Sequence, residues 1–298
     1  MNKLVDSMRS KLIVALAQVA SKMGDIEGNL SSVFEYVEKA KAAKADVVVF
    51  PELATSGYLS QGIFLETAER EATHLGRLMK ASREICVVLG IVEETDYGML
   101  YNSAMVLGHG NVVVGEAAGV KQRCYRKCYL PTYGMFEEHK WFASGQRIPI
   151  FVLDVPDIGR VKCGVVICED FWHPLPVASA CMRGAQFVCA ISSSPKTLRK
   201  PRMVDSLIMT RAIENCVYVV FVNSAGSEDM VNFWGGSEIV SAEGEVVVAA
   251  KEMEEDFVVG EIDLYKLKKL RQINPMLRDE RREVIEDYLS AYEEMRRV

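Results

Sequence analysis

The chain alternates short apolar runs with helical patterns along its whole length, and this alternation constrains the fold more than any other feature. The continuous apolar run Val47–Phe50 ends at Pro51 and is typical of a buried strand. Leu30, Val33 and Val37 instead recur at the spacing of a helix. We find no short-period repeat and no linker. Strands mixed with helices throughout predict one layered α/β domain.

The expected elements follow from the same two patterns. Helices are expected around Leu30–Val37, Leu75–Ile85, Val177–Met182 and Met203–Ile213, and in the charged C-terminal segment with a break near Pro275. The stretch Lys121–Arg147 has little periodicity, and loops of this length tend to be functional. Ile239–Ser241 and Val246–Ala249 are expected to pair as a hairpin. The other expected strands are Leu12–Ala17, Val47–Phe50, Val87–Ile91, Ala104–Leu107, Val112–Val114, Val165–Ile167, Phe187–Ile191, Val217–Val222 and Val258–Ile262.

Composition and charge exclude several classes of protein. With 298 residues, 49% hydrophobic and 26% charged, the chain is not disordered, collagenous or a coiled coil. A net charge of −6 argues against a broad basic surface for nucleic acid. No apolar run approaches the roughly 20 residues of a membrane helix. Lys3, Arg9 and Lys11 precede Leu12–Ala17 and superficially resemble a signal peptide, but Gln18 interrupts the short apolar stretch. We therefore expect a soluble, cytoplasmic protein.

Polar residues follow three of the expected strands, where ligands gather in open α/β sheets. Glu52 follows the first, Cys168 and Glu169 the second, and Asn223 the third. Glu52 is either a solvated residue that starts a loop or a partly desolvated ionisable group. Several of the eight cysteines lie in apolar runs, and the cysteines are interpreted as reduced core residues apart from one candidate.

Cys168 is either such a core thiol or a nucleophile. A nucleophilic thiol needs a lowered pKa or a nearby base, and its acidic neighbours Glu169 and Asp170 would raise its pKa. A cation from elsewhere is therefore required. The long loop offers five candidates, which are Lys121, Arg123, Arg126, Lys127 and Lys140.

Neither a metal nor a cofactor is expected. The four histidines are scattered, and the pairs Cys124/Cys128 and Cys163/Cys168 lack the partner ligands of a zinc site. The sequence contains neither the GxGxxG pattern nor a P-loop. Gly235-Gly236-Ser237 is interpreted as a turn before a strand.

Three sequence blocks, in this order, resemble the signatures of the nitrilase superfamily of carbon–nitrogen hydrolases. They are Phe50-Pro51-Glu52-Leu53 with Gly57-Tyr58, then Tyr125-Arg126-Lys127-Cys128-Tyr129-Leu130-Pro131, and Val166-Ile167-Cys168-Glu169-Asp170. The flanks Ala15-Leu16-Ala17-Gln18 and Leu277-Arg278-Asp279 also resemble the family, so the resemblance covers nearly the whole chain.

The resemblance implies a four-layer αββα sandwich over residues 1–263, followed by a helical tail over 264–298. It implies a triad of Glu52 as base, Lys127 as the stabilising cation and Cys168 as nucleophile. A second glutamate is expected to orient Lys127 and the attacking water. Glu138 fits this place best, and Glu137 is the alternative.

Within the superfamily, the chain most resembles the glutamine-hydrolysing domain of glutamine-dependent NAD synthetase, through Leu130–Phe136, Cys168–Trp172 and Ser192–Lys200. That likeness implies that Ser194 and Lys200 clamp a substrate carboxylate, because a cation and a hydroxyl suit such a group. It also implies that Glu169 and Tyr58 hold an amino group, and that Tyr133 and Phe136 line the site. The alternative for Ser192–Lys200 is a solvated surface loop.

Several functions remain open at this point. We expect an amidohydrolase that releases ammonia from a small amide through a Cys168 thioester. Alternatives are a glutaminase supplying ammonia to a separate synthetase, an N-carbamoyl amidase, an acyltransferase and a non-catalytic interaction module. The sequence ends at Val298 without a pyrophosphate loop of the SGGxDS type, so we expect that it does not itself make NAD. A homodimer or larger homo-oligomer is expected, with Leu264–Val298 as either an exchanged arm or a solvated terminal helix.

Overall fold

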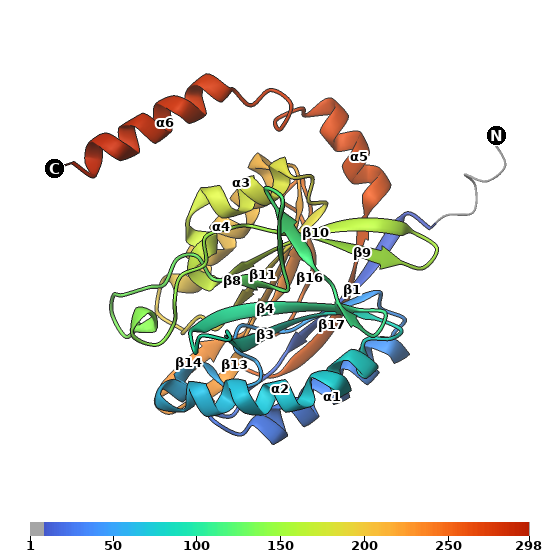
Figure 1. Cartoon of the computed structure of the whole chain (residues 1–298). Coiled ribbons are helices and arrows are strands. Elements are labelled where there is room, and N and C mark those ends of the chain that lie inside the picture. Colours follow the sequence, from blue (N-terminus) through green and yellow to red (C-terminus); the bar gives the residue numbers. More distant parts are fainter. Residues whose placement is uncertain (1–8, 298) are drawn as a thin grey trace.

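Two β-sheets stack face to face between two layers of helices in the computed structural model (Figure 1), which describes residues 9–297. Residues 1–8, including Lys3, and Val298 lie outside the described range. The first sheet runs in the order β17 (Asp256–Asp263), β1 (Lys11–Gln18), β2 (Val47–Val49), β3 (Cys86–Glu94), β4 (Leu100–Gly108) and β5 (Asn111–Val112), and β8 (Cys124–Arg126) also pairs with β4.

The second sheet has the same mixed character as the first. Its order is β16 (Val246–Ala249), β15 (Glu238–Val240), β12 (Tyr218–Asn223), β11 (Phe187–Ser192), β10 (Gly159–Ile167), β9 (Ile150–Val155), β6 (Gly115–Ala117) and β7 (Val120–Gln122). A separate ribbon pairs β13 (Ala225–Glu228) with β14 (Val231–Trp234).

Each sheet has three parallel strands at its centre, joined by helices. In the first sheet, α1 (Ile26–Ala42) connects β1 to β2, and α2 (Phe64–Ala81) connects β2 to β3. In the second, α3 (Pro174–Met182) connects β10 to β11, and α4 (Lys200–Glu214) connects β11 to β12. These βαβ units place the helices on the outer faces and bring the carboxyl ends of the central strands to one edge of each sheet.

The two-residue period of the strands explains the layering. Leu12, Val14 and Leu16 of β1 point into the core between the sheets, whereas Ala15 and Ala17 pack under α1. The second sheet alternates in the same way. Its Val165 and Ile167 join the inter-sheet core, and its Val166 packs against the outer helices. The αββα fold expected from the resemblance is thereby confirmed.

Several expected boundaries were wrong. The aperiodic stretch Lys121–Arg147 contains the last residues of β7, all of β8 and the short 3₁₀ helix η2 (Glu138–Lys140). The second helix ends at Ala81, and Ile85 lies beyond it in the core. Of Val112–Val114, only Val112 is in a strand, and β9, β13 and β14 were not anticipated. The expected hairpin is confirmed as β15 and β16.

Two further helices follow β17, the last strand in the chain and an edge strand of the first sheet. α5 (Leu264–Ile273) begins at Asp263, whose side chain accepts a hydrogen bond from the backbone of Lys266, and it buries Leu267. α6 (Arg282–Met295) stands away from the layered body in Figure 1 and buries none of its residues. No helix described within residues 9–297 is both long and apolar enough to cross a bilayer.

Candidate active site

The three residues of the expected triad each follow a strand, and the three strands come from both sheets. Glu52 follows β2, Lys127 follows β8 directly, and Cys168 follows β10 and opens the 3₁₀ helix η3 (Cys168–Trp172). All three are buried, with 1%, 0% and 7% of each residue exposed. The structure therefore gathers residues from distant parts of the chain, two of them at the carboxyl ends of central strands and Lys127 at the end of β8.

The turn that carries Glu52 depends on a close backbone approach. Gly90 of β3 lies so near this turn that a Cβ there would fall 2.3 Å from the Pro51 carbonyl oxygen and 2.8 Å from the Glu52 Cα. Leu53 adopts a left-handed backbone conformation, with φ of 48°, which a branched side chain rarely takes. This strained turn directs the Glu52 carboxylate toward the interior of the protein.

Lys127 lies between two carboxylates. Its Nζ donates a hydrogen bond of 2.7 Å to Glu52 Oε1 and one of 2.6 Å to Glu138 Oε1. Burial alone would lower the pKa of Lys127, but Glu138 and Glu52 outweigh it and raise that pKa well above its usual value. Lys127 therefore carries its positive charge near pH 7. Of the other cations considered from the sequence, Arg126 instead pairs with Glu93 on the outside of β8.

Glu138, rather than Glu137, is the glutamate that lies buried against Lys127. Its Oε1 also accepts a hydrogen bond of 2.6 Å from the Tyr58 hydroxyl, and the residue is 5% exposed. Glu137 is exposed and lies 3.8 Å from Lys140. Burial, and then the neighbouring Glu52, raise the pKa of Glu138 although Lys127 opposes them. Tyr58 is thus part of this buried cluster.

Cys168 sits on a sharp turn beside the charged cluster. Its φ of 44° is left-handed, so the turn between β10 and η3 is strained at the cysteine. Burial, followed by the Glu52 carboxylate, raises the pKa of the thiol to about 12, while Lys127 and Lys200 act in the opposite direction. The thiol is therefore neutral near pH 7 and needs a base to become a nucleophile.

Two residues beside Glu52 were missed by sequence reasoning. Asn102 of β4 donates from Nδ2 to Glu52 Oε1 at 2.7 Å and to Glu138 Oε2 at 3.4 Å. The backbone N–H of Ser193, just after β11, donates to Glu52 Oε2 at 2.7 Å. The position of Ser193 after an apolar strand was a usable signal, whereas Asn102 lies inside a strand and had none.

The sequence marked Asp170 only as an acidic neighbour of Cys168 and as part of a motif, and its structural role was also missed. Its carboxylate accepts hydrogen bonds from the Tyr125 hydroxyl at 2.6 Å and from the backbone N–H groups of Cys128 at 3.0 Å and Tyr129 at 2.8 Å. It therefore ties the segment that carries Lys127 to the turn that carries Cys168.

The expected substrate-binding residues divide between the cluster and an outer cavity. Tyr133, Phe136 and Lys200 line a cavity of about 690 Å³ with Trp172. The Lys200 ammonium lies 5.1 Å from the centre of the Phe136 ring and 5.9 Å from that of Trp172. Cation–π contacts of this kind hold the ammonium while leaving its donors available.

Glu169 and Ser194 lie beside this cavity. The Tyr133 hydroxyl donates to Glu169 Oε2 at 2.8 Å, and His173 lies 3.9 Å from the same carboxylate. Ser194 is buried, and its backbone N–H donates to Asn223 Oδ1 at 2.8 Å. Within residues 9–297, no hydrogen bond joins Ser194 to Lys200 or Tyr58 to Glu169. We call Tyr133, Glu169, Ser194 and Lys200 the mouth of the site.

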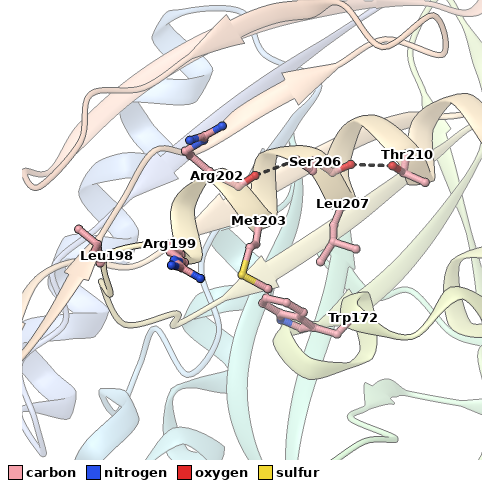
Figure 2. Close-up of a pocket in the computed structure, with 8 residues that line it drawn as sticks. All are labelled: Trp172, Leu198, Arg199, Arg202, Met203, Ser206, Leu207 and Thr210. Carbon is pink, nitrogen blue, oxygen red and sulfur yellow. Dashed lines mark hydrogen bonds between the residues drawn. The ribbon is translucent and has the colours of Figure 1, made fainter.

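A second open cavity, of about 710 Å³, lies along α4 (Figure 2). Met203 and Leu207 point from α4 toward Trp172, and Arg199 and Arg202 stand at the end near Leu198. Trp172 and Arg199 also line the first cavity, so the two are neighbours. In the described part of the chain, no three His, Cys, Asp or Glu side chains are grouped as metal ligands.

The arrangement combines a neutral thiol, a buried carboxylate and a fixed cation. The carboxylate is suited to accept a proton, and the ammonium is suited to stabilise negative charge that develops on an oxygen. Burial strengthens both effects, because charges interact more strongly away from water.

Comparison with known proteins places the chain in a family. The model of the carbon–nitrogen hydrolase family matches residues 13–272. A glutamine-dependent NAD(+) synthetase of Thermotoga maritima is 32% identical over 274 residues, which are 90% of this chain and 45% of that protein. The chain thus spans about half the length of this relative.

Two other relatives match over nearly their full length. A nitrilase of Pyrococcus abyssi is 31% identical over 279 residues, covering 91% of this chain and 97% of that protein. The fold matches the crystal structure of a carbon–nitrogen hydrolase from Helicobacter pylori, with a TM-score of 0.82 and 22% identity over 94% of this chain and 98% of that one. The chain is therefore a hydrolase that belongs to the carbon–nitrogen hydrolase family.

Proposed function

We propose that this protein hydrolyses the amide of a small molecule through a thioester on Cys168 and releases ammonia. The observation that carries the proposal is the buried Lys127 ammonium, held at 2.7 Å from Glu52 and 2.6 Å from Glu138 beside the buried Cys168. Keeping two carboxylates and an ammonium in the interior is costly, and such groups are typical of sites where charge is used in chemistry.

The reaction starts with proton transfer from the Cys168 thiol to Glu52 as the sulfur attacks the amide carbonyl carbon. The carbonyl oxygen becomes an oxyanion, which Lys127 and the backbone N–H of Glu169 stabilise. When the tetrahedral intermediate collapses, the C–N bond breaks, and ammonia leaves with the proton returned by Glu52. A thioester remains on Cys168.

Hydrolysis of the thioester reverses these roles. Glu52 accepts a proton from water, the hydroxide attacks the acyl carbon, and the C–S bond breaks. The acid product leaves, and the Cys168 sulfur regains its proton. Glu138 keeps Lys127 oriented toward the oxyanion in both halves of the reaction.

A panel of amides tests this function. The purified protein is incubated with glutamine, short aliphatic amides, N-carbamoyl compounds and a nitrile, and released ammonia is measured. Ammonia from at least one amide, with none from the Cys168→Ala variant, is the expected result. No ammonia from any compound, or equal release by the variant, would contradict it.

A second candidate function is a glutaminase that supplies ammonia to a synthetase. Lys200 favours it, because this cation faces a cavity beside Cys168 and suits the α-carboxylate of glutamine. The relatives named glutamine-dependent NAD(+) synthetases add support. Glutamine turnover that rises only when an NAD synthetase and its substrates are added would favour this candidate, whereas turnover of aliphatic amides alone would oppose it.

We further propose that residues 264–298 form an oligomerisation arm that contacts a second copy of the chain. α6 carries an exposed apolar face formed by Ile285, Tyr288, Leu289, Tyr292 and Met295. An exposed patch of this kind on a helix without buried residues indicates a protein interface. Light scattering should find a dimer or larger oligomer that Leu289→Glu disrupts and that Ser290→Glu leaves intact. A monomeric parent protein would contradict the proposal.

A further inference from the structure

We propose that Asn102 is a positioning residue of this active site, and that its side-chain amide holds Glu52 and Glu138 around Lys127 so that Glu52 can deprotonate Cys168. This inference deepens the proposed function and rests on it.

Asn102 is connected to all three charged residues of the cluster. Its backbone carbonyl accepts a hydrogen bond of 2.9 Å from the backbone N–H of Lys127. Its Nδ2 donates to Glu52 Oε1 at 2.7 Å and lies 3.4 Å from Glu138 Oε2. One fully buried residue of β4 thereby fixes the start of the Lys127 side chain and the positions of both carboxylates.

The charges around Asn102 explain why an uncharged donor is needed there. Two carboxylates share the single Lys127 ammonium, so their ionised forms repel each other across the cluster. A second cation would relieve that repulsion, but it would also make Glu52 a weaker base. An amide N–H holds the carboxylates in place and adds no charge, so it weakens Glu52 as a base less than a second cation would.

The carbonyl oxygen of the Asn102 side chain gives independent support for this positioning role. Asn102 Oδ1 is buried and has no hydrogen-bond partner among the residues described. A buried amide that serves the fold alone ordinarily pairs both of its polar atoms. The opposite orientation of the amide would point Oδ1 at Glu52 and Glu138, where it would meet acceptors. Asn102 thus leaves its oxygen unpaired and directs its donor at the cluster.

Two substitutions remove the donor in different ways. Asn102→Asp preserves the shape of the side chain and replaces the donor by an acceptor, so packing is unchanged. Asn102→Leu removes both polar atoms, including the unpaired oxygen. The matched control is Ser103→Ala, because Ser103 is the next residue of β4, is equally buried and donates at 2.8 Å to Glu93 outside the cluster.

Two readouts are measured against pH for each variant. One is kcat and KM with the amide that the parent protein hydrolyses. The other is the rate at which iodoacetamide alkylates Cys168, followed by mass spectrometry of the peptide that contains it. The alkylation does not need turnover, so it tests Asn102 even when no amide is hydrolysed and the proposed function fails. Thermal melting verifies that each variant is folded.

Loss of the donor makes ionisation of the two carboxyl groups less favourable. In Asn102→Leu, the acid limbs of the kcat profile and of the alkylation profile should therefore move to higher pH by about 1 unit. Asn102→Asp, which adds a third carboxyl group, should shift them at least as far. At pH 7, kcat should fall by about 10- to 100-fold while KM changes less than about threefold. Ser103→Ala should keep the parental profiles.

Either of two results overturns the proposal. One is that folded Asn102→Leu and Asn102→Asp retain the parental acid limb and kcat. The other is that Ser103→Ala produces the same shift, which would assign the effect to β4 as a whole and leave Asn102 without a specific role.

Discussion

The buried cluster and the mouth of the site are built in different ways. Glu52 and Lys127 are 1% and 0% exposed, and hydrogen bonds of 2.6 to 2.7 Å link them to one another and to Glu138 and Asn102. At the mouth, Lys200 is only partly buried and rests on aromatic rings. This difference supports the proposal that rigid groups in the interior carry out the reaction and that more exposed groups at the rim select the substrate.

Replacement of the nucleophile should have the largest effect. We expect Cys168→Ala to lower kcat by at least about 10⁴-fold, because no thioester can form. Burial keeps the thiol neutral, with a pKa of about 12, so the substitution removes no charge and the fold should be retained. Cys128→Ala, a half-buried cysteine outside the cluster, is the control and should keep its activity. Ammonia release and thermal melting measure both effects.

Glu137 and Glu138 are adjacent in the sequence, so their variants compare the loss of an exposed carboxylate with the loss of a buried one. Glu138→Gln should lower kcat by about 10²- to 10³-fold, since Lys127 loses a charged partner at 2.6 Å. Glu137→Gln removes the same charge one residue away at an exposed site and should change kcat by less than about twofold. Equal losses in the two variants would remove the distinction between buried and exposed carboxylates.

The pH dependence of Cys168 alkylation separates two roles for Glu52. As a charge alone, Glu52 raises the pKa of the thiol, so Glu52→Gln would lower that pKa and accelerate alkylation near pH 7. As a general base, Glu52 takes the proton, so Glu52→Gln should slow alkylation at pH 7 by about 100-fold. We expect the slower reaction, with a rate that still rises toward high pH. Faster alkylation would contradict the base assignment.

A substitution at the mouth should change recognition more than chemistry. Lys200→Met should raise KM for glutamine by about 10- to 100-fold through loss of a charge-assisted contact with the carboxylate. KM for an aliphatic amide without a carboxylate should stay the same. Lys196→Met, an exposed lysine on the same cavity that lies 3.7 Å from Glu252, controls for loss of charge alone. A uniform effect on both substrates would place Lys200 in the chemistry.

Much of the fold was predictable from local patterns. Runs such as Val47–Val49 and Phe187–Ser192 are buried on both faces and have the continuous apolar sequence of central parallel strands. The strand β14 contains polar Asn232 between Val231 and Phe233, and β8 is only three residues long, so neither gives a distinct pattern. Such strands are specified by their neighbours rather than by their own sequences.

The site was predictable where a residue lay at a strand end or in a motif. Position at a strand end marked Glu52 and Cys168 as candidates, and the family resemblance then assigned roles to them and to Lys127 and Glu138. Asn102 could not be found in this way, because its importance comes from three contacts with residues 25 or more positions away. The opposite environments of Glu137 and Glu138 also appear only when the chain has folded.

The central claim is that Cys168 carries the acyl group of the substrate. Rapid mixing of the protein with its amide substrate, followed by acid quenching and mass spectrometry, tests this directly. The account predicts an added mass equal to the acyl group on the peptide that contains Cys168, appearing no later than the first ammonia. Ammonia release at the full rate without any adduct, or an adduct on another residue, would contradict it.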